Sequence, residues 1–399
     1  MDKKTKMRFS TICARENHNI ENGSPHILPL HASSAFSFSN LDASIEIFSG
    51  QKEGFVYSRF GNPTVTSVQN KLAALETIDL DQEGFCVLTA SGMAAISTLA
   101  SSQLKSGEAL LTSTNLYGGT SEVFSKVLSR NGVDIIYVDF KDEVAITNAI
   151  TTNPNIKLIY FETPSNPVLS CLDIKMIISK AKANNILTAI DNTFATCYIQ
   201  RPLTMGVDFV IYSTTKFLNG HGNSIAGAII GKSEELRHNI WTHMKLLGTN
   251  CSPFEAWLVH NGLKTLPLRM DKHCHNAMEL SQYLEKHSKI KKVNYPGLDK
   301  FPDHNIAKKQ MSKYGGMLSF EIDGDINDAK KFMNNTKLCS ITSTLGNTDT
   351  LLLHPATSSH LNIDPEVRLA NGISDSLVRV SVGIEDINDL IEDFELGLL

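Results

Sequence analysis

Short runs of hydrophobic residues alternate with longer amphipathic segments in the middle of the chain, from residue 61 to residue 255. Each short run has the length of one strand, and several segments between the runs have the period of an amphipathic helix. The predicted strands are Phe85–Thr89, Ala109–Thr112, Asp134–Val138, Leu158–Glu162, Leu187–Asp191, Phe209–Ser213 and Ala226–Gly231. The predicted helices between them include Ala94–Gln103, Ser121–Asn131 and Ile174–Asn184. Regular alternation of strands and helices predicts an α/β domain built on a large, mostly parallel sheet.

The two ends of the chain have different patterns. Residues 1–60 are polar and rich in turn residues, with little periodicity, and they predict an arm that needs another surface to pack against. Residues 256–399 begin in the long helical pattern Glu255–Leu263 and contain two strand-like stretches, Met317–Ile322 and Leu377–Val382, among helices. This last part therefore predicts a smaller α+β domain at the C-terminus.

Length and composition narrow the class of protein. A chain of 399 residues is longer than one hydrophobic core usually serves, so two domains are expected. The net charge is −5 and no basic run stands out, which gives no reason to expect nucleic acid or an anionic membrane as a partner. The N-terminus lacks the apolar core of a secretory signal, and no apolar stretch is long enough to span a bilayer. The seven cysteines are widely spaced without a CxxC pair, so we expect reduced thiols in a cytoplasmic protein.

A lysine and a carboxylate follow two of the predicted strands. Lys216 ends the segment Ser-Thr-Thr-Lys, which directly follows a strand, and ligands of open α/β sheets bind at the carboxyl ends of strands. Asp191 ends the preceding strand, so both side chains can face one small ligand. Pyridoxal phosphate (PLP) requires such a pair, a lysine on its aldehyde carbon and an acid on its ring nitrogen. Taken singly, Lys216 also fits a solvated loop lysine, and Asp191 also fits a turn cap.

Further segments suit parts of the same ligand. Gly92 and Met93 open a helix after a strand, where backbone N–H groups attract phosphate. Tyr117 follows another strand and could stack on an aromatic ring. Tyr57 and Arg59 lie two apart in extended chain and could grip a phosphate together. Each of these segments alone also fits ordinary packing or an exposed surface.

Two more features concern anions and metals. Arg379 lies among apolar residues of a predicted strand, and a buried arginine needs an anion, for which a substrate carboxylate would serve. The segment His273-Cys274-His275 has the composition of a metal site. On a helix, however, residues i and i+2 point to different faces, so we expect no metal there.

The chain also carries a series of motifs in a fixed order. They are YSRFGNPT, ASGMAA, LYGGT, FETPSNP, DNT, YSTTK, GLKTLPLRM, HPATSSH and LVRVSVGIED. The series resembles, essentially end to end, the Cys/Met-metabolism (transsulfuration) family of PLP-dependent enzymes. The resemblance implies PLP-dependent transferase fold type I, like aspartate aminotransferase, with pyridoxal 5'-phosphate as cofactor.

The resemblance also implies roles for individual residues. Lys216 would hold the cofactor as a Schiff base, Asp191 would pair with the ring nitrogen, and Tyr117 would stack on the ring and assist proton transfer. The phosphate would contact Gly92, Met93, Ser213 and Thr215, together with Tyr57 and Arg59 from the neighbouring subunit. The substrate carboxylate would contact Asn166, Thr344 and Arg379. Such shared sites imply a dimer, and the family usually pairs dimers into a homotetramer.

Several positions bear on which member of the family this chain resembles. Methionine γ-lyases carry a cysteine where this chain has Gly119. Many cystathionine enzymes carry an arginine for a second charged end of the substrate where this chain has Glu122, and cystathionine γ-lyases carry a glutamate in place of Ser343. Residues 247–257 are most similar to O-acylhomoserine sulfhydrylases. Residues 220–223 read Gly-His-Gly-Asn, which departs from the family's Gly-His-Ser-Asp.

These comparisons within the family favour γ-replacement on an O-acyl-L-homoserine by sulfide or a small thiol, which yields homocysteine, with cystathionine formation close behind. The alternative is a γ-lyase that releases a thiol, ammonia and 2-oxobutanoate from methionine or cystathionine. A non-catalytic PLP-fold binding protein would predict loss of Lys216, Asp191 or Arg379, and all three are present. The expected partners are a small amino-acid substrate and further copies of the chain.

Overall fold

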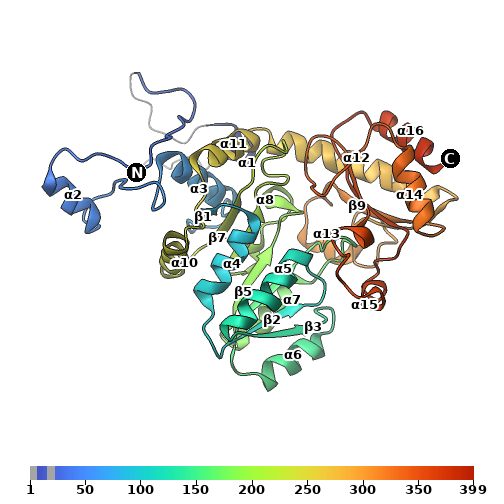
Figure 1. Cartoon of the computed structure of the whole chain (residues 1–399), viewed down its shortest axis with the longest axis horizontal. Coiled ribbons are helices and arrows are strands. Elements are labelled where there is room, and N and C mark those ends of the chain that lie inside the picture. The colour runs from blue at the N-terminus through green and yellow to red at the C-terminus, as the bar shows by residue number, and fades with distance from the viewer. Residues whose placement is uncertain (1–6, 16–22) are drawn as a thin grey trace.

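The large sheet positions most of the predicted site residues. The computed structural model describes residues 7–15 and 23–399, and this sheet has seven strands in the order β1-β7-β6-β5-β4-β2-β3 (Figure 1). They are β1 (Phe85–Thr89), β2 (Ala109–Ser113), β3 (Asp134–Val138), β4 (Ile156–Glu162), β5 (Leu187–Asp191), β6 (Phe209–Ser213) and β7 (Gly227–Gly231). Only β7 within the sheet runs antiparallel to its neighbours, β1 and β6. The predicted α/β fold with a mostly parallel sheet is therefore confirmed.

Helices cover both faces of this sheet, because successive side chains of a strand point in opposite directions. In β1, Phe85 and Val87 belong to one core, whereas Cys86 and Leu88 belong to the other. The first core lies under α4 (Gly92–Gln103), α5 (Gly118–Val123) and α10 (Glu234–Leu247). The second lies under α3 (Pro63–Glu76), α6 (Glu143–Thr152), α7 (Ile174–Ala183), α8 (Thr196–Ile199) and α9 (Pro202–Met205). The predicted helix 121–131 continues α5 through a π-helical turn, η1 (Phe124–Leu128), and a 3-10 turn, η2 (Ser129–Asn131).

A second sheet follows, with five strands in the order β10-β11-β12-β9-β8. They are β8 (Ile290–Asn294), β9 (Met317–Ile322), β10 (Ser340–Ile341), β11 (Leu351–Leu353) and β12 (Leu377–Ser381). The accompanying helices are α11 (Pro253–Leu263), α12 (Leu266–Lys286), α13 (His304–Gln310), α14 (Ile326–Asn335), η3 (Pro355–Thr357), α15 (Pro365–Ala370) and α16 (Ile387–Leu398). Phe320 of β9 packs on Phe332 of α14 and Phe394 of α16, with ring centroids 5.3 and 6.0 Å away. The second sheet therefore shares one aromatic core with α14 and α16.

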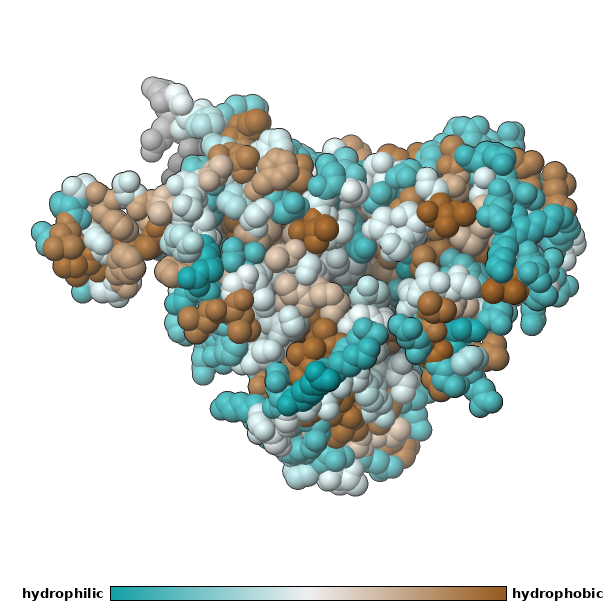
Figure 2. All heavy atoms as spheres, in the orientation of Figure 1, coloured by the Kyte–Doolittle hydropathy of each residue, from teal (hydrophilic) through white to brown (hydrophobic). Residues whose placement is uncertain are grey.

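The N-terminal residues contain two helices that the sequence pattern did not predict. Helix α1 (Phe9–Ala14) buries Cys13 and packs against α3 and α12. This part of the predicted arm therefore packs on its own chain. Helix α2 (Leu41–Phe48) instead projects from the body of the molecule (Figure 1). Its Leu41, Ile45 and Phe48 are 74%, 54% and 64% exposed, and they form a hydrophobic patch in Figure 2. Exposed apolar side chains gathered in this way are typical of a surface that binds a partner.

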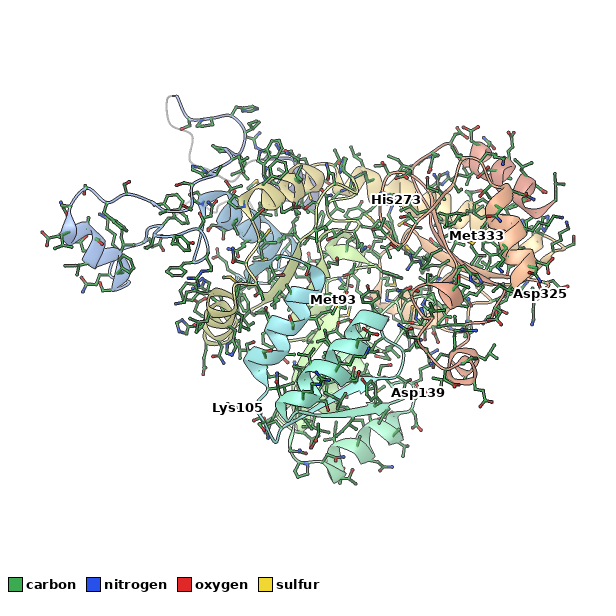
Figure 3. The ribbon with its side chains drawn as sticks, viewed as in Figure 1. Met93, Lys105, Asp139, His273, Asp325 and Met333 are labelled. Atoms are coloured by element: carbon green, nitrogen blue, oxygen red, sulfur yellow. The ribbon has the colours of Figure 1, made fainter. Side chains whose placement is uncertain are left out.

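Within residues 7–15 and 23–399, no helix combines the length and the hydropathy that crossing a bilayer requires. Nor does any group of three or more His, Cys, Asp or Glu side chains gather there in a way that could hold a metal ion. His273, on α12 in Figure 3, is buried, and its Nδ1 lies 2.7 Å from the carbonyl oxygen of Val382. This histidine therefore contributes to packing in the core.

Candidate active site

Lys216 lies three residues beyond the end of β6, in a tight turn. Its N–H donates to the carbonyl of Ser213 (3.1 Å), and its own carbonyl accepts from the N–H of Gly220 (2.8 Å). The turn directs the side chain into a cavity of about 680 Å³ lined by residues from both sheets. There the Lys216 amine lies 3.0 Å from Oγ1 of Thr344. The position after a strand that the sequence predicted thus places an amine inside this cavity.

Residues far along the chain fix this turn. The buried guanidinium of Arg269, on α12, donates to the carbonyls of Phe217 (2.8 Å) and Leu218 (3.3 Å). Gly346 packs directly on the turn with φ at +81°, and a Cβ there would lie 2.5 Å from the nitrogen of Phe217. The N–H of Gly346 donates in turn to Oγ of Ser381 (2.7 Å) on β12. The second sheet and its helices therefore hold the lysine turn in place, and the sequence analysis did not foresee these contacts.

The surroundings of Lys216 favour its neutral form. Burial, followed by the positive charge of Arg379, lowers the pKa of the Lys216 amine to about 8. A neutral amine can attack an aldehyde and accept a proton, whereas an ammonium group can do neither. The site therefore prepares the lysine for the chemistry that the sequence predicts.

Two carboxyl groups end adjacent strands opposite the lysine. Asp191 ends β5 and pairs in register with Glu162 at the end of β4. Asp191 accepts the N–H of Thr193 (2.9 Å), and both oxygens of Glu162 accept the N–H of Tyr117 (2.9 and 3.0 Å). Burial and then the charge of Asp191 raise the pKa of Glu162 to about 8, and burial also raises the pKa of Asp191. A cationic ligand beside them would reverse these shifts. Glu162 lies in the motif FETPSNP, but the sequence pattern predicts no role for it.

The start of α4 forms an anion-binding corner of the cavity. Met93 lies at this end of the helix (Figure 3), whose first N–H groups have no partner within the helix. A Cβ on Gly92 would lie 2.8 Å from Cβ of Ser213, so only glycine lets the helix approach the end of β6 so closely. Such N–H groups beside a serine hydroxyl suit a phosphate. Thr215 also lines the cavity, but its hydroxyl donates to the carbonyl of Ala226 (3.2 Å).

Arg379 lies on the opposite wall, on β12, and is only 3% exposed. Its Nη1 donates to Oδ1 of Asn166 (3.2 Å), and its Nη2 donates to the carbonyl of Thr344 (3.1 Å). Among the described residues, its buried Nε has no hydrogen-bond partner. Burial lowers the pKa of Arg379 to about 10, because the guanidinium is removed from water. A buried guanidinium in this position needs an anionic ligand.

Ten predicted site residues line this one cavity. They are Gly92, Met93, Tyr117, Asn166, Asp191, Ser213, Thr215, Lys216, Thr344 and Arg379. Tyr57 and Arg59 do not line it. Instead, Tyr57 is exposed, and the Arg59 guanidinium donates to the carbonyl of Lys245 and lies 4.9 Å from the ring centroid of Phe60. Neither of these two predicted site residues therefore lies against the cavity of its own chain.

An α/β fold with a buried lysine of lowered pKa, paired carboxyl groups and an anion corner around one cavity is typical of an enzyme that holds an aldehyde cofactor on a lysine. The family described as Cys/Met metabolism PLP-dependent enzyme matches residues 10–399. The chain therefore belongs to this family, is an enzyme and uses pyridoxal phosphate as its cofactor. Family and cofactor agree with the resemblance drawn from the motifs, and the prediction of an enzyme is confirmed over the remote alternative of a non-catalytic binding protein.

The relatives carry several different activities. The chain is 41% identical to an L-methionine γ-lyase of Porphyromonas gingivalis, over 93% of this chain and 92% of that protein. It is 38% identical to an O-succinylhomoserine sulfhydrylase of Pseudomonas aeruginosa, over 98% of this chain and 95% of that protein. A solved cystathionine γ-synthase from Xanthomonas oryzae pv. oryzae superposes with a TM-score of 0.92 at 33% identity, covering 99% of this chain and 98% of that one. The relatives thus define the family and leave the reaction to be argued from the site.

The pKa of Lys216 leads to a first prediction. Because only the neutral amine adds to the cofactor aldehyde, capture of pyridoxal phosphate by the apoenzyme should accelerate as pH rises and level off above about pH 8. At pH 6 the rate should be about a hundredfold lower than the plateau, tenfold for each pH unit. Arg379→Met removes a like charge and should move the midpoint to higher pH. The visible absorbance of the bound cofactor measures the rate, and an unchanged midpoint in this variant would contradict the assigned cause.

Proposed function

We propose that the chain catalyses γ-replacement on an O-acyl-L-homoserine with an uncharged acyl group, using sulfide or a small thiol. One observation carries this proposal. Among the described residues lining the cavity, only Lys216 and Arg379 are cationic. One is needed for the cofactor and the other for the α-carboxylate, so neither remains for a second carboxylate farther along the substrate. An acetyl group therefore suits this cavity better than a succinyl group or the second amino-acid end of cystathionine.

The cavity fits pyridoxal phosphate, and we propose a role for each wall. Lys216 holds the aldehyde carbon, and Asp191 holds the protonated ring nitrogen. Burial raises the pKa values of Asp191 and Glu162, and the cationic ring nitrogen would lower both again by stabilising the carboxylates. The phosphate occupies the corner of Gly92, Met93 and Ser213, with Thr215 able to contribute after its hydroxyl rotates. Tyr117 is 44% exposed and offers its ring face as a stacking surface.

The substrate is held on the other side. The unpartnered Nε of Arg379, with Asn166 and Thr344 beside the guanidinium, binds the α-carboxylate. When bound, the cofactor supplies an electron sink for a carbanion at the substrate α-carbon. The Lys216 amine, with its pKa lowered to about 8, accepts the α-proton and can move a proton between neighbouring carbons. Oγ1 of Thr344 steadies this amine at 3.0 Å.

The second candidate is γ-elimination from methionine, which the similarity to an L-methionine γ-lyase favours. Its uncharged thioether also suits a cavity without a further cation. Against it stands Gly119, which occupies the position where those lyases carry a cysteine. A Cβ there would lie 2.7 Å from Cε1 of Tyr117 and 3.2 Å from Sδ of Met93, so a side chain at this position would displace the ring. We therefore rank replacement first.

The test is a comparison of substrates with the PLP-loaded enzyme. O-acetyl- and O-succinyl-homoserine are each incubated with sulfide or cysteine, and methionine and cystathionine are incubated alone. We expect the fastest turnover for O-acetylhomoserine with sulfide, with homocysteine as product. Faster release of 2-oxobutanoate from methionine would place elimination first. Preference for O-succinylhomoserine with cysteine would overturn the argument from charge.

We also propose that Tyr57 and Arg59 complete the phosphate corner of a neighbouring copy. Both residues lie outside their own cavity and follow the exposed apolar helix α2, which offers a surface for a second chain. The full assembly would be a cytoplasmic homotetramer of two such dimers. All seven cysteines are free and buried, which suits a reducing compartment.

A mixing experiment tests this sharing. Arg59→Ala and Lys216→Ala should each be inactive, but a dimer with one chain of each kind has one site with both lesions and one with neither. With random exchange, half the dimers are mixed and half of their sites are intact, so about a quarter of wild-type activity should return. Tagged subunits confirm that exchange has occurred. If exchange occurs without recovery, Arg59 serves its own chain.

A further inference from the structure

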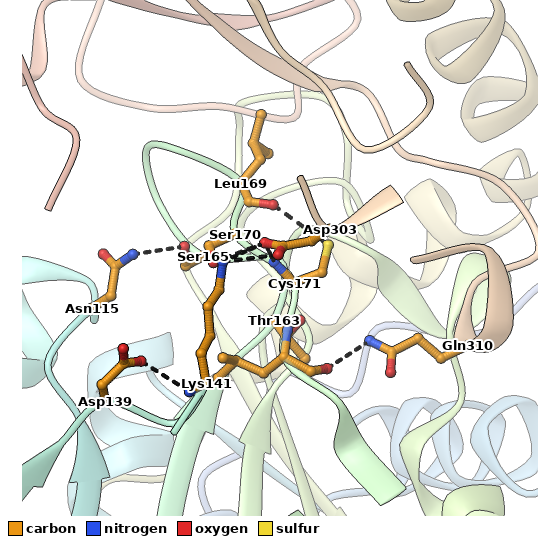
Figure 4. Close-up of polar contacts among 11 residues, drawn as sticks. Asn115, Asp139, Lys141, Thr163, Ser165, Leu169, Ser170, Cys171, Asp303 and Gln310 are labelled. Carbon is orange, nitrogen blue, oxygen red and sulfur yellow. Dashed lines mark hydrogen bonds and ion pairs between the residues drawn. The ribbon is translucent and has the colours of Figure 1, made fainter. Parts of the chain in front are cut away.

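A buried aspartate that does not line the active-site cavity holds a loop of the active site. Asp303, the residue before α13, is buried, and both of its carboxylate oxygens accept from Nζ of Lys141 (2.9 and 2.8 Å) (Figure 4). Asp303 also accepts the hydroxyl of Ser170 (3.1 Å) and the N–H of Cys171 (2.9 Å). Lys141 follows β3 of the large sheet, and Asp303 follows β8 of the second sheet. Ser170 and Cys171 lie in the loop after β4, so the cluster ties this loop to both sheets.

The loop held in this way carries a predicted substrate contact. The N–H of Ser165 donates to the carbonyl of Ser170 (3.0 Å), and the N–H of Leu169 donates to the carbonyl of Ser165 (2.9 Å). These bonds close residues 165–170 into a turn, and Asn166 accepts Nη1 of Arg379 (3.2 Å) directly beside it. Asp303 therefore reaches the Arg379 guanidinium through one short, hydrogen-bonded turn.

The backbone conformation of this turn is unfavourable for one of its own residues. Leu169 has φ at +60°, the left-handed region in which a Cβ approaches the neighbouring carbonyl oxygen too closely. Its side chain is also buried, so the turn keeps this conformation only while its surroundings fix it. Asp303 accepts four bonds that can fix the turn: two from the Lys141 amine, one from Ser170 within the turn and one from Cys171 directly after it.

The turn also separates two cavities. Asn166 lines the active-site cavity, while Ser165, Lys141 and Asp303 line a second cavity of about 350 Å³. Glu162 lines both. A shift of the turn toward the second cavity would therefore withdraw Asn166 from Arg379, and there is space for such a shift.

We propose that Asp303, supported by Lys141, is a positioning residue that sets how strongly the site prefers ligands with a carboxylate. The proposal rests on the proposed function, which assigns Arg379 and Asn166 to the substrate carboxylate. Asp303 does not touch the substrate and acts through the turn that carries Asn166. Its loss should thus weaken carboxylate recognition more than it weakens cofactor binding or the reactivity of the lysine linkage.

Two small probes separate these effects without turnover. Aminooxyacetate and methoxyamine both react with the PLP-loaded enzyme and bleach its visible absorbance, but only aminooxyacetate carries a carboxylate. The ratio of their rate constants measures carboxylate preference. Asp303→Ala should lower this ratio by about tenfold, as expected for lost charge-assisted hydrogen bonds. Lys141→Met should lower it by about threefold, and Asp303→Asn, which can still accept the Cys171 N–H, should fall between wild type and Asp303→Ala.

Asp393 provides a matched control. It is another buried aspartate that accepts backbone N–H groups, those of Lys337, Leu338 and Cys339, but it does not line the active-site cavity. Asp393→Ala should lower thermal stability and leave the ratio of the two rates at its wild-type value. An equal fall in the Asp303 and Asp393 variants would mean general loosening of the protein and would overturn the proposal.

Arg379→Met separates failure of this proposal from failure of the proposed function. If Arg379→Met leaves the ratio unchanged, the assignment of the carboxylate to Arg379 is wrong, and the proposal falls with it. If that variant lowers the ratio but the Asp303 variants do not, the proposal alone is wrong. Should Asp303→Ala fail to fold, Asp303→Asn and Lys141→Met decide the outcome, because a wild-type ratio in both would contradict the role of the pair.

Discussion

Lys216→Ala should lower kcat by on the order of 10⁴-fold, the upper range for loss of a positioned general base. The substitution removes both the covalent anchor of the cofactor and the amine that accepts the α-proton. Borohydride should fix the cofactor to the peptide containing Lys216 in the wild-type enzyme and to no peptide in the variant. Added methylamine should restore part of the activity, because a small neutral amine fits the space that the side chain leaves.

Lys232 provides the control for this experiment. Burial also lowers the pKa of Lys232, but its amine donates to the carbonyl of Leu203 (3.2 Å), and the residue does not line the active-site cavity. Lys232→Ala should therefore keep both kcat and the borohydride label on Lys216. Reduction that labels another lysine in the wild-type enzyme would remove the basis of the site assignment.

Asp191→Ala should lower kcat by roughly 10²-fold or more while the enzyme retains cofactor, because Lys216 and the phosphate corner are unchanged. Without the carboxylate, the pKa of the cofactor's ring nitrogen falls and the electron sink weakens. Stopped assays for kcat and the visible spectrum for cofactor content measure the two effects separately. A variant with near-normal kcat would refute the role assigned to Asp191.

Glu162→Gln is the matched comparison, since Glu162 lies beside Asp191 in register and has a pKa raised to about 8. Glutamine can still accept the N–H of Tyr117, so this variant should lose far less activity than Asp191→Ala. If the two variants lose equal activity, the carboxyl groups share the function that we assign to Asp191 alone.

The sequence predicted the large sheet well for a physical reason. Strands such as β1, β5 and β6 begin and end at the predicted residues, because largely buried strands covered by helices on both faces are apolar runs that stop where the sheet ends. Strand β8 reads Ile-Lys-Lys-Val-Asn at the sheet edge, and β10 and β11 have only two and three residues. Neither a solvated edge nor so short a strand leaves a clear hydrophobic pattern.

The cavity shows a similar division. Residues that follow strands or open helices, such as Lys216, Asp191 and Gly92, could be identified because their position relative to an element is visible in the sequence. Arg269 and Asp303 could not, because each acts on backbone groups distant in the chain. Asp303 is 132 residues from Cys171, and no local pattern records which carbonyl or N–H a side chain will meet.

The contact of Gly346 with the Lys216 turn has a consequence for how the enzyme is made. Gly346 follows the lysine by well over a hundred residues, and Ser381, which holds Gly346, comes later still. A nascent chain can fold its large sheet while the ribosome still holds the C-terminal segment. At that stage the Lys216 turn lacks its contacts with Gly346 and, through Gly346, with Ser381. Maturation with the vitamin-derived cofactor should therefore follow translation, and chains that stall before Ser381 should leave the ribosome colourless.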